Sequence, residues 1–167
     1  LYAGRISLEK GVMEIPEIYR KVKEEIKDIQ LVIAGSGPAE KELKAAIPDA
    51  MYLGWVDHND LPNIYSAADL LVLPSKFDTF SCVVLESFSC GLPVVAYKTK
   101  GPKDIIQNGK NGYVVTNRDQ MIQSVMAYFR YEELQKSFKK SAVIRAKAYT
   151  KKGIIDQFLF DTGLHNC

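Results

Sequence analysis

Two carboxylates, Asp78 and Glu86, flank the start of a predicted helix near the middle of the chain. Residues 82–90 are apolar almost all round, so we expect a buried helix in which Glu86 needs a hydrogen-bond partner. The preceding turn, residues 79–81, offers free backbone N–H groups at the positive end of this helix, an arrangement that binds anions. Glu86 lies roughly 7 to 8 Å beyond Ser81, at about 1.5 Å of rise per residue.

This spacing fits a ligand with a diphosphate in the middle and a hydroxylated ring at each end. Asp78 would bond one ring, the turn formed by Thr79, Phe80 and Ser81 would hold the diphosphate, and Glu86 would bond the other ring. A nucleotide-sugar has this shape. The residues leave one alternative open, in which Asp78 only caps the helix and Glu86 pairs with a lysine.

Two cations flank the first predicted strand-to-helix turn. Arg5 and Lys10 stand where charge-assisted hydrogen bonds can clamp a diphosphate. Taken alone, they are explained more simply as ordinary surface charges. These two residues alone therefore do not indicate a diphosphate site.

A glycine-rich turn follows the second predicted strand. Gly35 and Gly37 do not fit a dinucleotide-cofactor fingerprint, because the turn follows the second strand and Glu40 holds the position of the third glycine. The turn indicates only a place where the backbone can approach a ligand.

Strand-length and helix-length patterns alternate along the chain. Strands are expected at residues 1–6, 31–34, 51–53, 70–73, 94–96 and 112–115. Helices are expected at residues 12–26, 39–47, 59–67, 82–90, 103–107, 118–129, 132–148 and 151–160. This alternation predicts an α/β fold, a Rossmann-like doubly wound parallel sheet of about six strands with helices on both faces. Such folds bind ligands at the carboxyl ends of their strands, where Arg5, Gly35, Trp55 and Asp78 fall.

Composition predicts one globular domain. The chain has 167 residues, of which 47% are hydrophobic and 25% charged. A formal net charge of +2 gives no support for a nucleic-acid partner. Three scattered cysteines favour a reducing, cytoplasmic location, and no metal-ligand spacing, signal peptide or bilayer-spanning run is found in this sequence. Because the chain opens inside a predicted strand without a methionine, it is expected to be a fragment.

Residues 74–96 resemble the signature of the group 1, or family 4, retaining glycosyltransferases of the GT-B fold. That signature reads PS-x-x-E-x-F-G-x-x-x-L-E-A-x-A-x-G-x-P-V-V-A, and this chain has PSKFDTFSCVVLESFSCGLPVVA. Asp78 stands where the first Glu is usual and is one methylene shorter. Ser81 stands where Gly is common and keeps the backbone N–H.

Two further segments are similar to motifs of the same family. GRISLEKG, which contains Arg5 and Lys10, is similar to G-R-x-x-x-x-K-G, whose cations hold the donor diphosphate and stabilise the leaving nucleotide. Gly35 and Gly37 are similar to a G-x-G-P turn that lines the donor site. The resemblance therefore implies that Arg5 and Lys10 are catalytic and that both glycines contact the donor.

The resemblance also covers the third strand and one turn near the centre of the chain. Trp55 and Val56 are similar to a G-x-V segment whose backbone meets the nucleobase, although Trp55 fits a core aromatic equally well. Residues 101–105 are similar to a G-x-x-E-I turn and are expected to be structural.

The resemblance implies that residues 1–167 form the nucleotide-sugar-binding, carboxyl-terminal half of a two-domain enzyme whose acceptor-binding half is absent. Such an enzyme transfers a hexose, with retention and without metal or other cofactor, to a hydroxyl acceptor in glycolipid or polysaccharide biosynthesis. Glu86 would bind the ribose and Asp78 the sugar, with a UDP-sugar favoured over a GDP-sugar. Peripheral attachment to the inner face of the membrane through the absent half stays open. Two other functions also stay open: a nucleotide-sugar 2-epimerase and a degenerate nucleotide-binding module.

Overall fold

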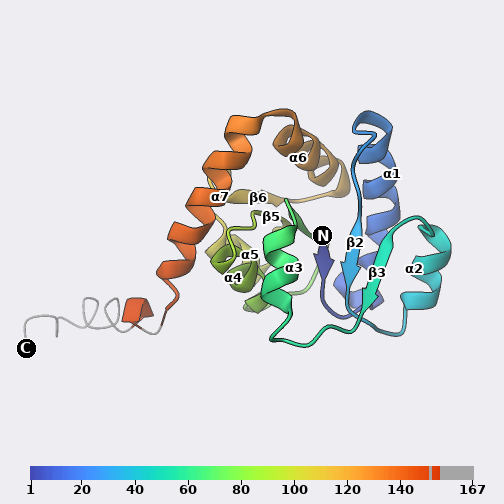
Figure 1. The fold of residues 1–167 in the computed structure, drawn as a ribbon, viewed down its shortest axis with the longest axis horizontal. Coiled ribbons are helices and arrows are strands. Elements are labelled where there is room, and N and C mark those ends of the chain that lie inside the picture. The colour runs from blue at the N-terminus through green and yellow to red at the C-terminus, as the bar shows by residue number, and fades with distance from the viewer. Residues whose placement is uncertain (151, 155–167) are drawn as a thin grey trace, which may run out of the picture.

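The computed structural model describes residues 1–150 and 152–154, in which strands and helices alternate (Figure 1). The strands are β1 (Tyr2–Ala3), β2 (Val32–Ala34), β3 (Met51–Gly54), β4 (Leu71–Leu73), β5 (Val94–Tyr97) and β6 (Gly112–Val115). The helices are α1 (Ile15–Glu25), α2 (Glu40–Ala46), α3 (Leu61–Ala67), α4 (Cys82–Ser89), α5 (Lys100–Ile105), α6 (Arg118–Arg130) and α7 (Glu132–Lys147). Two short 3₁₀ helices, Leu8–Lys10 and Val12–Glu14, lead into α1.

All strand pairs are parallel, in two three-stranded ladders ordered β1-β2-β3 and β4-β5-β6. The ladders meet at β1 and β4, where the Leu1 nitrogen donates to the Leu70 oxygen and the Val72 nitrogen donates to the Leu1 oxygen, both at 2.9 Å. The strands therefore lie in the order β3-β2-β1-β4-β5-β6. The direction of winding reverses between β1 and β4, and a ligand crevice is expected at such a reversal.

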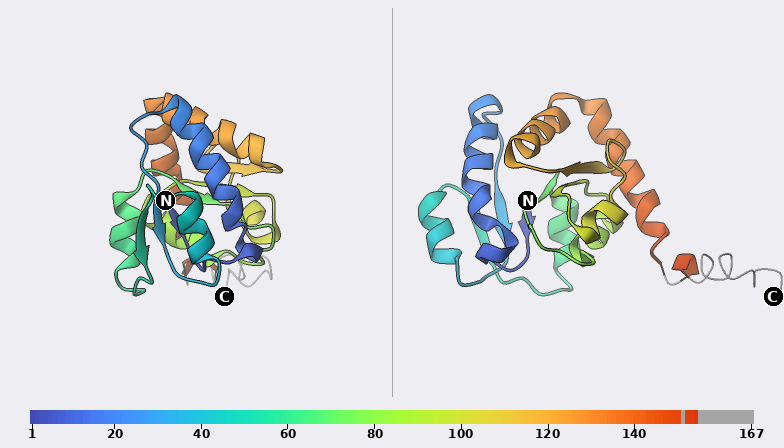
Figure 2. Two further views of the ribbon diagram at one scale, coloured as in Figure 1. Left: turned by 90° about the vertical axis from the view of Figure 1, so that its right-hand side faces the viewer. Right: turned by 180° about the vertical axis from the view of Figure 1, so that it is seen from behind.

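Helices cover both faces of this sheet, as predicted (Figure 2). Successive strand side chains point to opposite faces, so Tyr2 packs with α1 and α2 while Ala3 packs with α3 and α4. Helix α6 continues the first layer beside α1, and α7 packs against α4 in the second. Val84 and Phe88 of α4 are fully buried against β4 and β5. Helix α4 is thereby fixed in position at the centre of the fold.

Some boundaries differ from the sequence-based expectation. Strand β1 has two residues rather than six. Backbone hydrogen bonds to the segment after β2 continue at Gly4 and Ile6, but Gly4 adopts a φ of 144°, which interrupts the regular ladder. Helix α5 begins at Lys100, three residues earlier than expected. Asp60 occupies the N-cap position of α3, and its side chain makes no capping hydrogen bond. The helix expected at residues 151–160 lies largely outside the described residues.

Candidate functional site

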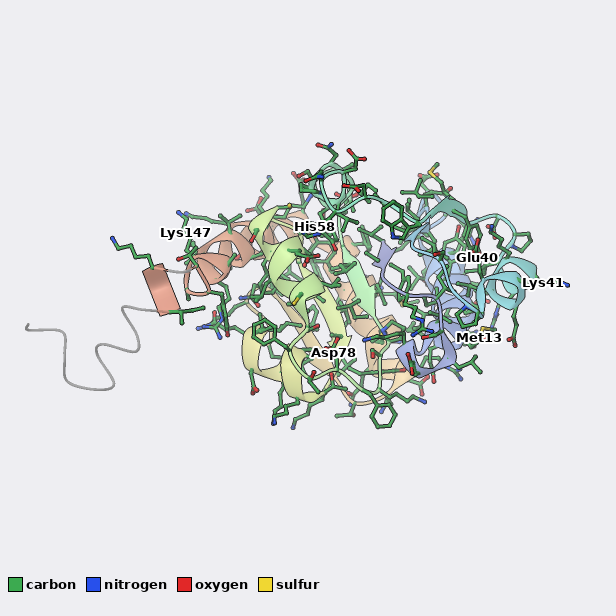
Figure 3. All side chains as sticks on the ribbon, turned by 90° about the horizontal axis from the view of Figure 1, so that it is seen from below. Met13, Glu40, Lys41, His58, Asp78 and Lys147 are labelled. Carbon is green, nitrogen blue, oxygen red and sulfur yellow. The ribbon has the colours of Figure 1, made fainter. Side chains whose placement is uncertain are left out.

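The three predicted catalytic residues meet at the crevice between β1 and β4. Arg5 and Lys10 come from the loop after β1, and Asp78 comes from the loop after β4. All three line a small cavity of about 50 Å³, together with Val83 from the first turn of α4. Figure 3 views the molecule from the side toward which β1 and β2 run, with Asp78 labelled on this face. The fold thus brings two distant segments of the chain to one site.

A larger cavity of about 540 Å³ adjoins the first on the side of β2 and β3. It is lined by residues that include Arg5, Gly35, Gly37, Trp55 and Val56. Gly4 and Arg5 line both cavities, so the two cavities are neighbours at the carboxyl ends of the strands. The Trp55 residue is 73% exposed, so its interpretation as a core aromatic is wrong.

Gly35 and Gly37 lie where the loop after β2 crosses the loop after β1. A Cβ atom at Gly35 would lie 1.9 Å from the Gly4 oxygen, and one at Gly37 would lie 2.3 Å from the Ile6 oxygen. Any side chain here would force the two loops apart. These glycines therefore shape the floor of the larger cavity, independently of any contact with a ligand.

Helix α4 begins at the crevice with an unusual backbone conformation. Ser81 precedes the helix with φ 61° and ψ 58°, a left-handed conformation that costs a non-glycine residue about 1–2 kcal/mol. Within the described residues, no backbone oxygen accepts the N–H groups of residues 79–83. The beginning of α4 therefore presents free N–H donors, as predicted. The left-handed conformation also gives a physical reason for the glycine that is common at this position in the resembling motif.

Asp78 is held by a side chain from this same turn. The Ser81 hydroxyl donates to Asp78 Oδ2 at 3.0 Å, and no side chain caps α4. The alternative in which Asp78 caps the helix is therefore wrong. Thr79 and Phe80 are exposed beside it, and of the two only Thr79 lines a cavity.

Glu86 lies one turn further along α4, between α3 and α4. Its Oε2 accepts a hydrogen bond of 3.0 Å from the hydroxyl of Tyr65, so the alternative of a lysine partner is wrong. Burial raises the pKa of Tyr65, and the neighbouring charge of Glu86 raises it further, so the hydroxyl stays protonated and donates. Glu86 is on the same face of α4 as Val83, which lines the small cavity, but Glu86 itself lines none of these cavities. A carboxylate has about four acceptor positions, so it can still receive ligand hydroxyls.

The loop that carries Asp78 is held from behind by α5. The Gly101 nitrogen donates to the Asp78 oxygen at 3.1 Å. A Cβ atom at Gly101 would lie 2.7 Å from the Phe80 carbonyl carbon and 3.0 Å from its Cα. Only glycine allows the two backbones to approach this closely, which agrees with the structural role expected for residues 101–105.

Replacing Gly101 with alanine is therefore expected to displace residues 78–81. Overpacking of this kind costs typically 1–3 kcal/mol, and each kcal/mol lowers the unfolding midpoint by about 2–4 °C in a domain of this size. Thermal unfolding measures the effect, and Lys103→Ala on the exposed side of α5 is the matched control. A midpoint equal to that of the control would mean that the loop is not held by Gly101.

Sequence analysis missed a group of cations beside Asp78. Lys76, Lys98 and Lys100 line a third cavity of about 420 Å³ together with Lys10 and Asp78. Lys98 follows β5 directly and Lys76 follows β4 closely, so the sequence indicated that both lie at the carboxyl ends of strands. The sequence did not indicate that the two lysines lie close together, because that depends on the pairing of β4 with β5.

Other kinds of site find little support in the described part of the chain. Within residues 1–150 and 152–154, no three His, Cys, Asp or Glu side chains are placed to share a metal ion. None of the helices in those residues combines the length and the apolar character needed to cross a bilayer. Cys82 and Cys90 are both free thiols.

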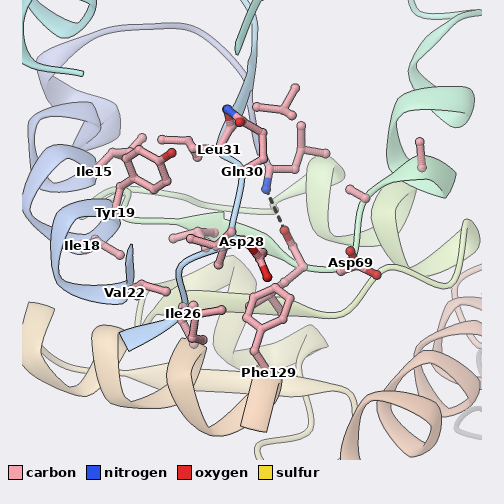
Figure 4. Close-up of a pocket in the computed structure, with 18 residues that line it drawn as sticks. Ile15, Ile18, Tyr19, Val22, Ile26, Asp28, Gln30, Leu31, Asp69 and Phe129 are labelled. Atoms are coloured by element: carbon pink, nitrogen blue, oxygen red, sulfur yellow. Dashed lines mark hydrogen bonds between the residues drawn. The ribbon is translucent and has the colours of Figure 1, made fainter. Parts of the chain in front are cut away.

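A separate cavity of about 380 Å³ lies at the opposite, amino ends of the strands (Figure 4). It is lined mainly by apolar side chains, which come from α1, α6 and the segments that lead into β2 and β4, together with Asp28 and Asp69. None of the predicted site residues lines it. We therefore place the candidate site at the carboxyl ends of the strands.

Comparison with curated proteins places this chain in a family. The chain matches the family model of glycosyl transferases group 1 over residues 1–145. It is 35% identical over 114 residues to a GDP-mannose-dependent alpha-mannosyltransferase of Corynebacterium glutamicum, covering 68% of this chain and 26% of that protein. It is 35% identical over 121 residues to an alpha-D-kanosaminyltransferase of Streptomyces kanamyceticus, covering 69% of this chain and 31% of that protein. The chain thus spans about a quarter to a third of these relatives.

Solved structures confirm the predicted Rossmann-like fold. The C-terminal domain of the group 1 family glycosyl transferase LpcC from Francisella tularensis matches with a TM-score of 0.81 and 22% identity, covering 89% of this chain and 83% of that one. Anabaena HepE in complex with UDP matches with a TM-score of 0.83 and 21% identity, covering 96% of this chain and 47% of that one. From the family model over most of its length, this chain belongs to the group 1 glycosyl transferases of the GT-B fold.

Proposed function

We propose that this chain is the donor-binding half of a two-domain glycosyltransferase, which transfers a hexose from a nucleoside diphosphate to a hydroxyl acceptor with retention. One observation carries the proposal: Arg5, Lys10 and Asp78 line a single cavity at the crevice of a group 1 family fold. The two-domain arrangement is supported by the relatives, because this chain covers only 26% and 31% of their length. It is also supported by the match to an isolated C-terminal domain.

In this proposal the diphosphate lies over the crevice between Arg5 and Lys10. Breaking a sugar–phosphate bond builds negative charge on the departing oxygen, and fixed cations stabilise that charge. Arg5 pairs with Glu9 at 3.8 Å, but both side chains are largely exposed, so the pair is weak and Arg5 can turn to a ligand. The free N–H groups of residues 79–81 add uncharged donors at the positive end of α4.

The nucleoside would occupy the larger cavity, whose volume of about 540 Å³ is typical of small-molecule sites. Its base would meet the backbone of Trp55 and Val56, next to Gly35 and Gly37, and its ribose would bond Glu86. We favour a uridine nucleotide. UDP is bound in the Anabaena HepE structure, whereas the name of the Corynebacterium relative specifies GDP-mannose.

The sugar would lie at Asp78, whose carboxylate accepts from sugar hydroxyls while Ser81 fixes its direction. In this scheme no protein nucleophile is needed on this half. The acceptor hydroxyl, held by the other half, attacks from the face that the diphosphate leaves. The positive charges of Arg5 and Lys10 supply the neutralisation that a metal ion would otherwise provide, so we propose a metal-independent transfer.

Product analysis by proton NMR on the full-length enzyme tests the reaction type. With an α-linked donor, the anomeric coupling constant of the product is expected to report an α linkage. A β-linked product would contradict retention. An epimerised sugar formed without acceptor would indicate a 2-epimerase, and donor binding without transfer or hydrolysis would indicate a degenerate module.

A further inference from the structure

The cavity that contains Lys76, Lys98 and Lys100 lies beyond the proposed sugar position. The larger cavity of about 540 Å³ is formed by loops after β1, β2 and β3, whereas this one is formed by loops after β1, β4 and β5. Asp78 therefore stands between the two. A donor held by Lys10, Asp78 and Thr79 would occupy one end of this third cavity, and the end formed by Lys76, Lys98 and Lys100 is left to another molecule or group.

Positive charge is concentrated in this third cavity. Four lysines line it, Lys10, Lys76, Lys98 and Lys100, with Asp78 as the single carboxylate, although the whole chain has a net charge of only +2. In the described residues, neither Lys98 nor Lys100 forms an ion pair. A concave site lined by one sign of charge raises the local concentration of oppositely charged ligands.

The cavity continues toward α1 and α6. A neighbouring cavity of about 520 Å³ shares Lys76 and Lys98 with it and adds Arg118. Glu14 also lines this cavity, and its carboxylate pairs with Lys76 at 3.0 Å and Arg118 at 3.6 Å. Glu14 thus positions two of the cations but offsets only one of the two charges.

The size of this region indicates what it holds. The cavity nearest Asp78, about 420 Å³, is within the size range of small-molecule sites and is larger than one substituent of a donor hexose would fill. The exposed ring of Phe77 and the hydroxyl groups of Thr79 and Thr99 line the cavity nearest Asp78, so it offers an apolar surface and polar contacts beside the lysines. These features fit a second substrate better than part of the donor.

We infer that the acceptor carries an anionic group, a phosphate or a carboxylate, which binds Lys76, Lys98 and Lys100 beside Asp78. This inference rests on the proposed function and adds the chemical class of the acceptor. The group belongs either to a soluble phosphorylated compound or to the headgroup of an anionic lipid. In both cases the lysines anchor the anionic group of the acceptor, while the other half of the enzyme holds the acceptor hydroxyl toward the sugar.

The test uses ¹H–¹⁵N NMR spectra of the 167-residue chain with its donor site saturated by UDP or GDP, whichever binds. Glycerol 3-phosphate is then titrated, with glycerol as the neutral match. The amide signals of residues 76–79 and 98–100 are expected to shift with glycerol 3-phosphate but not with glycerol. In Lys98→Gln/Lys100→Gln the affinity is expected to fall about tenfold or more, because charge-assisted hydrogen bonds are lost.

The matched control is Lys103→Gln/Lys110→Gln, which removes the same charge from exposed positions outside these cavities. It should bind glycerol 3-phosphate like the parent chain. A lipid source is tested by sedimentation with vesicles of phosphatidylcholine alone or with phosphatidylglycerol. Binding to the anionic vesicles alone, lost in the Lys98/Lys100 variant, assigns the anion to a lipid.

Three results would overturn the inference. The first is a chain that binds the nucleoside diphosphate but neither glycerol 3-phosphate nor anionic vesicles. The second is a control variant whose affinity for glycerol 3-phosphate falls as much as that of the Lys98/Lys100 variant, which would indicate general charge attraction. The third is a Lys98/Lys100 variant whose affinity for UDP-glucuronic acid falls while its affinities for UDP-glucose and glycerol 3-phosphate do not. That result would assign the cavity to the donor sugar. If no nucleoside diphosphate binds the parent chain, the proposed function itself fails.

Discussion

Replacing Lys10 with alanine in the full-length enzyme is expected to lower kcat for sugar transfer by about 100- to 1,000-fold. Lys10 lines the crevice with Arg5 and Asp78. In the proposed transfer, the departing phosphate oxygen gains negative charge there. Loss of one preorganised group that stabilises such charge typically costs two to three powers of ten in rate. Because that charge develops in the transition state, the donor KM should change much less than kcat.

Arg5→Ala should act in the same direction, and the double variant should lose less than the product of the two single effects, because the side chains would share one ligand. Lys21→Ala, on the exposed surface of α1, is the matched control. Steady-state kinetics with varied donor separates kcat from KM. A Lys10→Ala enzyme that keeps more than half of the parent kcat would remove Lys10 from the catalytic group.

Replacing Glu86 with alanine is expected to weaken binding of the nucleoside diphosphate by about tenfold or more. In the proposed complex the variant loses a charged acceptor for the ribose hydroxyls, and hydrogen bonds to charged groups contribute about 1.5–3 kcal/mol. It also leaves the buried hydroxyl of Tyr65 without its partner, which costs about 1–3 kcal/mol of folding stability. Calorimetric titration and thermal unfolding measure the two effects separately.

A second variant separates binding from folding at this position. Glu86→Ala/Tyr65→Phe removes the orphaned hydroxyl, so it should regain much of the lost stability while nucleotide binding stays weak. Tyr65→Phe alone keeps the carboxylate and should retain most of the affinity. If the double variant binds nucleotide as tightly as the parent, Glu86 has a structural role only.

Much of the fold was predictable from the sequence because the apolar runs, the helical periodicity and the alternation of the two all indicate the same architecture. Apolar runs marked the strands, and their alternation with helices fixed the parallel topology and placed Arg5 and Asp78 at carboxyl ends. The length of β1 was not predictable. Backbone hydrogen bonds continue to Ile6, but regular strand geometry ends where Gly4 and Gly35, with φ of 144° and 143°, let the two loops cross, and this crossing depends on tertiary packing.

The candidate site was predictable only in part. The grouping of Arg5, Lys10 and Asp78 follows from two motifs and a strand order. The hydrogen-bond partner of Glu86 could not be predicted in this way, because Tyr65 lies 21 residues earlier in the sequence, on a neighbouring helix. The lysine-lined cavity depends on the loops after β4 and β5 being adjacent, which a linear pattern does not show.

The left-handed conformation of Ser81 was visible only indirectly. The sequence showed a serine where glycine is common, but not that the residue adopts a positive φ or that its hydroxyl binds Asp78. A serine here adds a hydrogen bond to the carboxylate that glycine lacks. That bond offers a physical reason why this chain carries the shorter Asp78 together with Ser81.

The central claim, that this chain binds a nucleoside-diphosphate sugar, is tested most directly by thermal unfolding with UDP, GDP, ADP, their sugar conjugates and NAD. A ligand at about 100 times its Kd adds roughly 2.7 kcal/mol, which raises the midpoint by about 5–11 °C in a domain of this size. We predict a rise with one nucleoside diphosphate series, uridine before guanosine, and none with NAD. A rise with NAD alone, or no rise with any nucleoside diphosphate, would contradict the account.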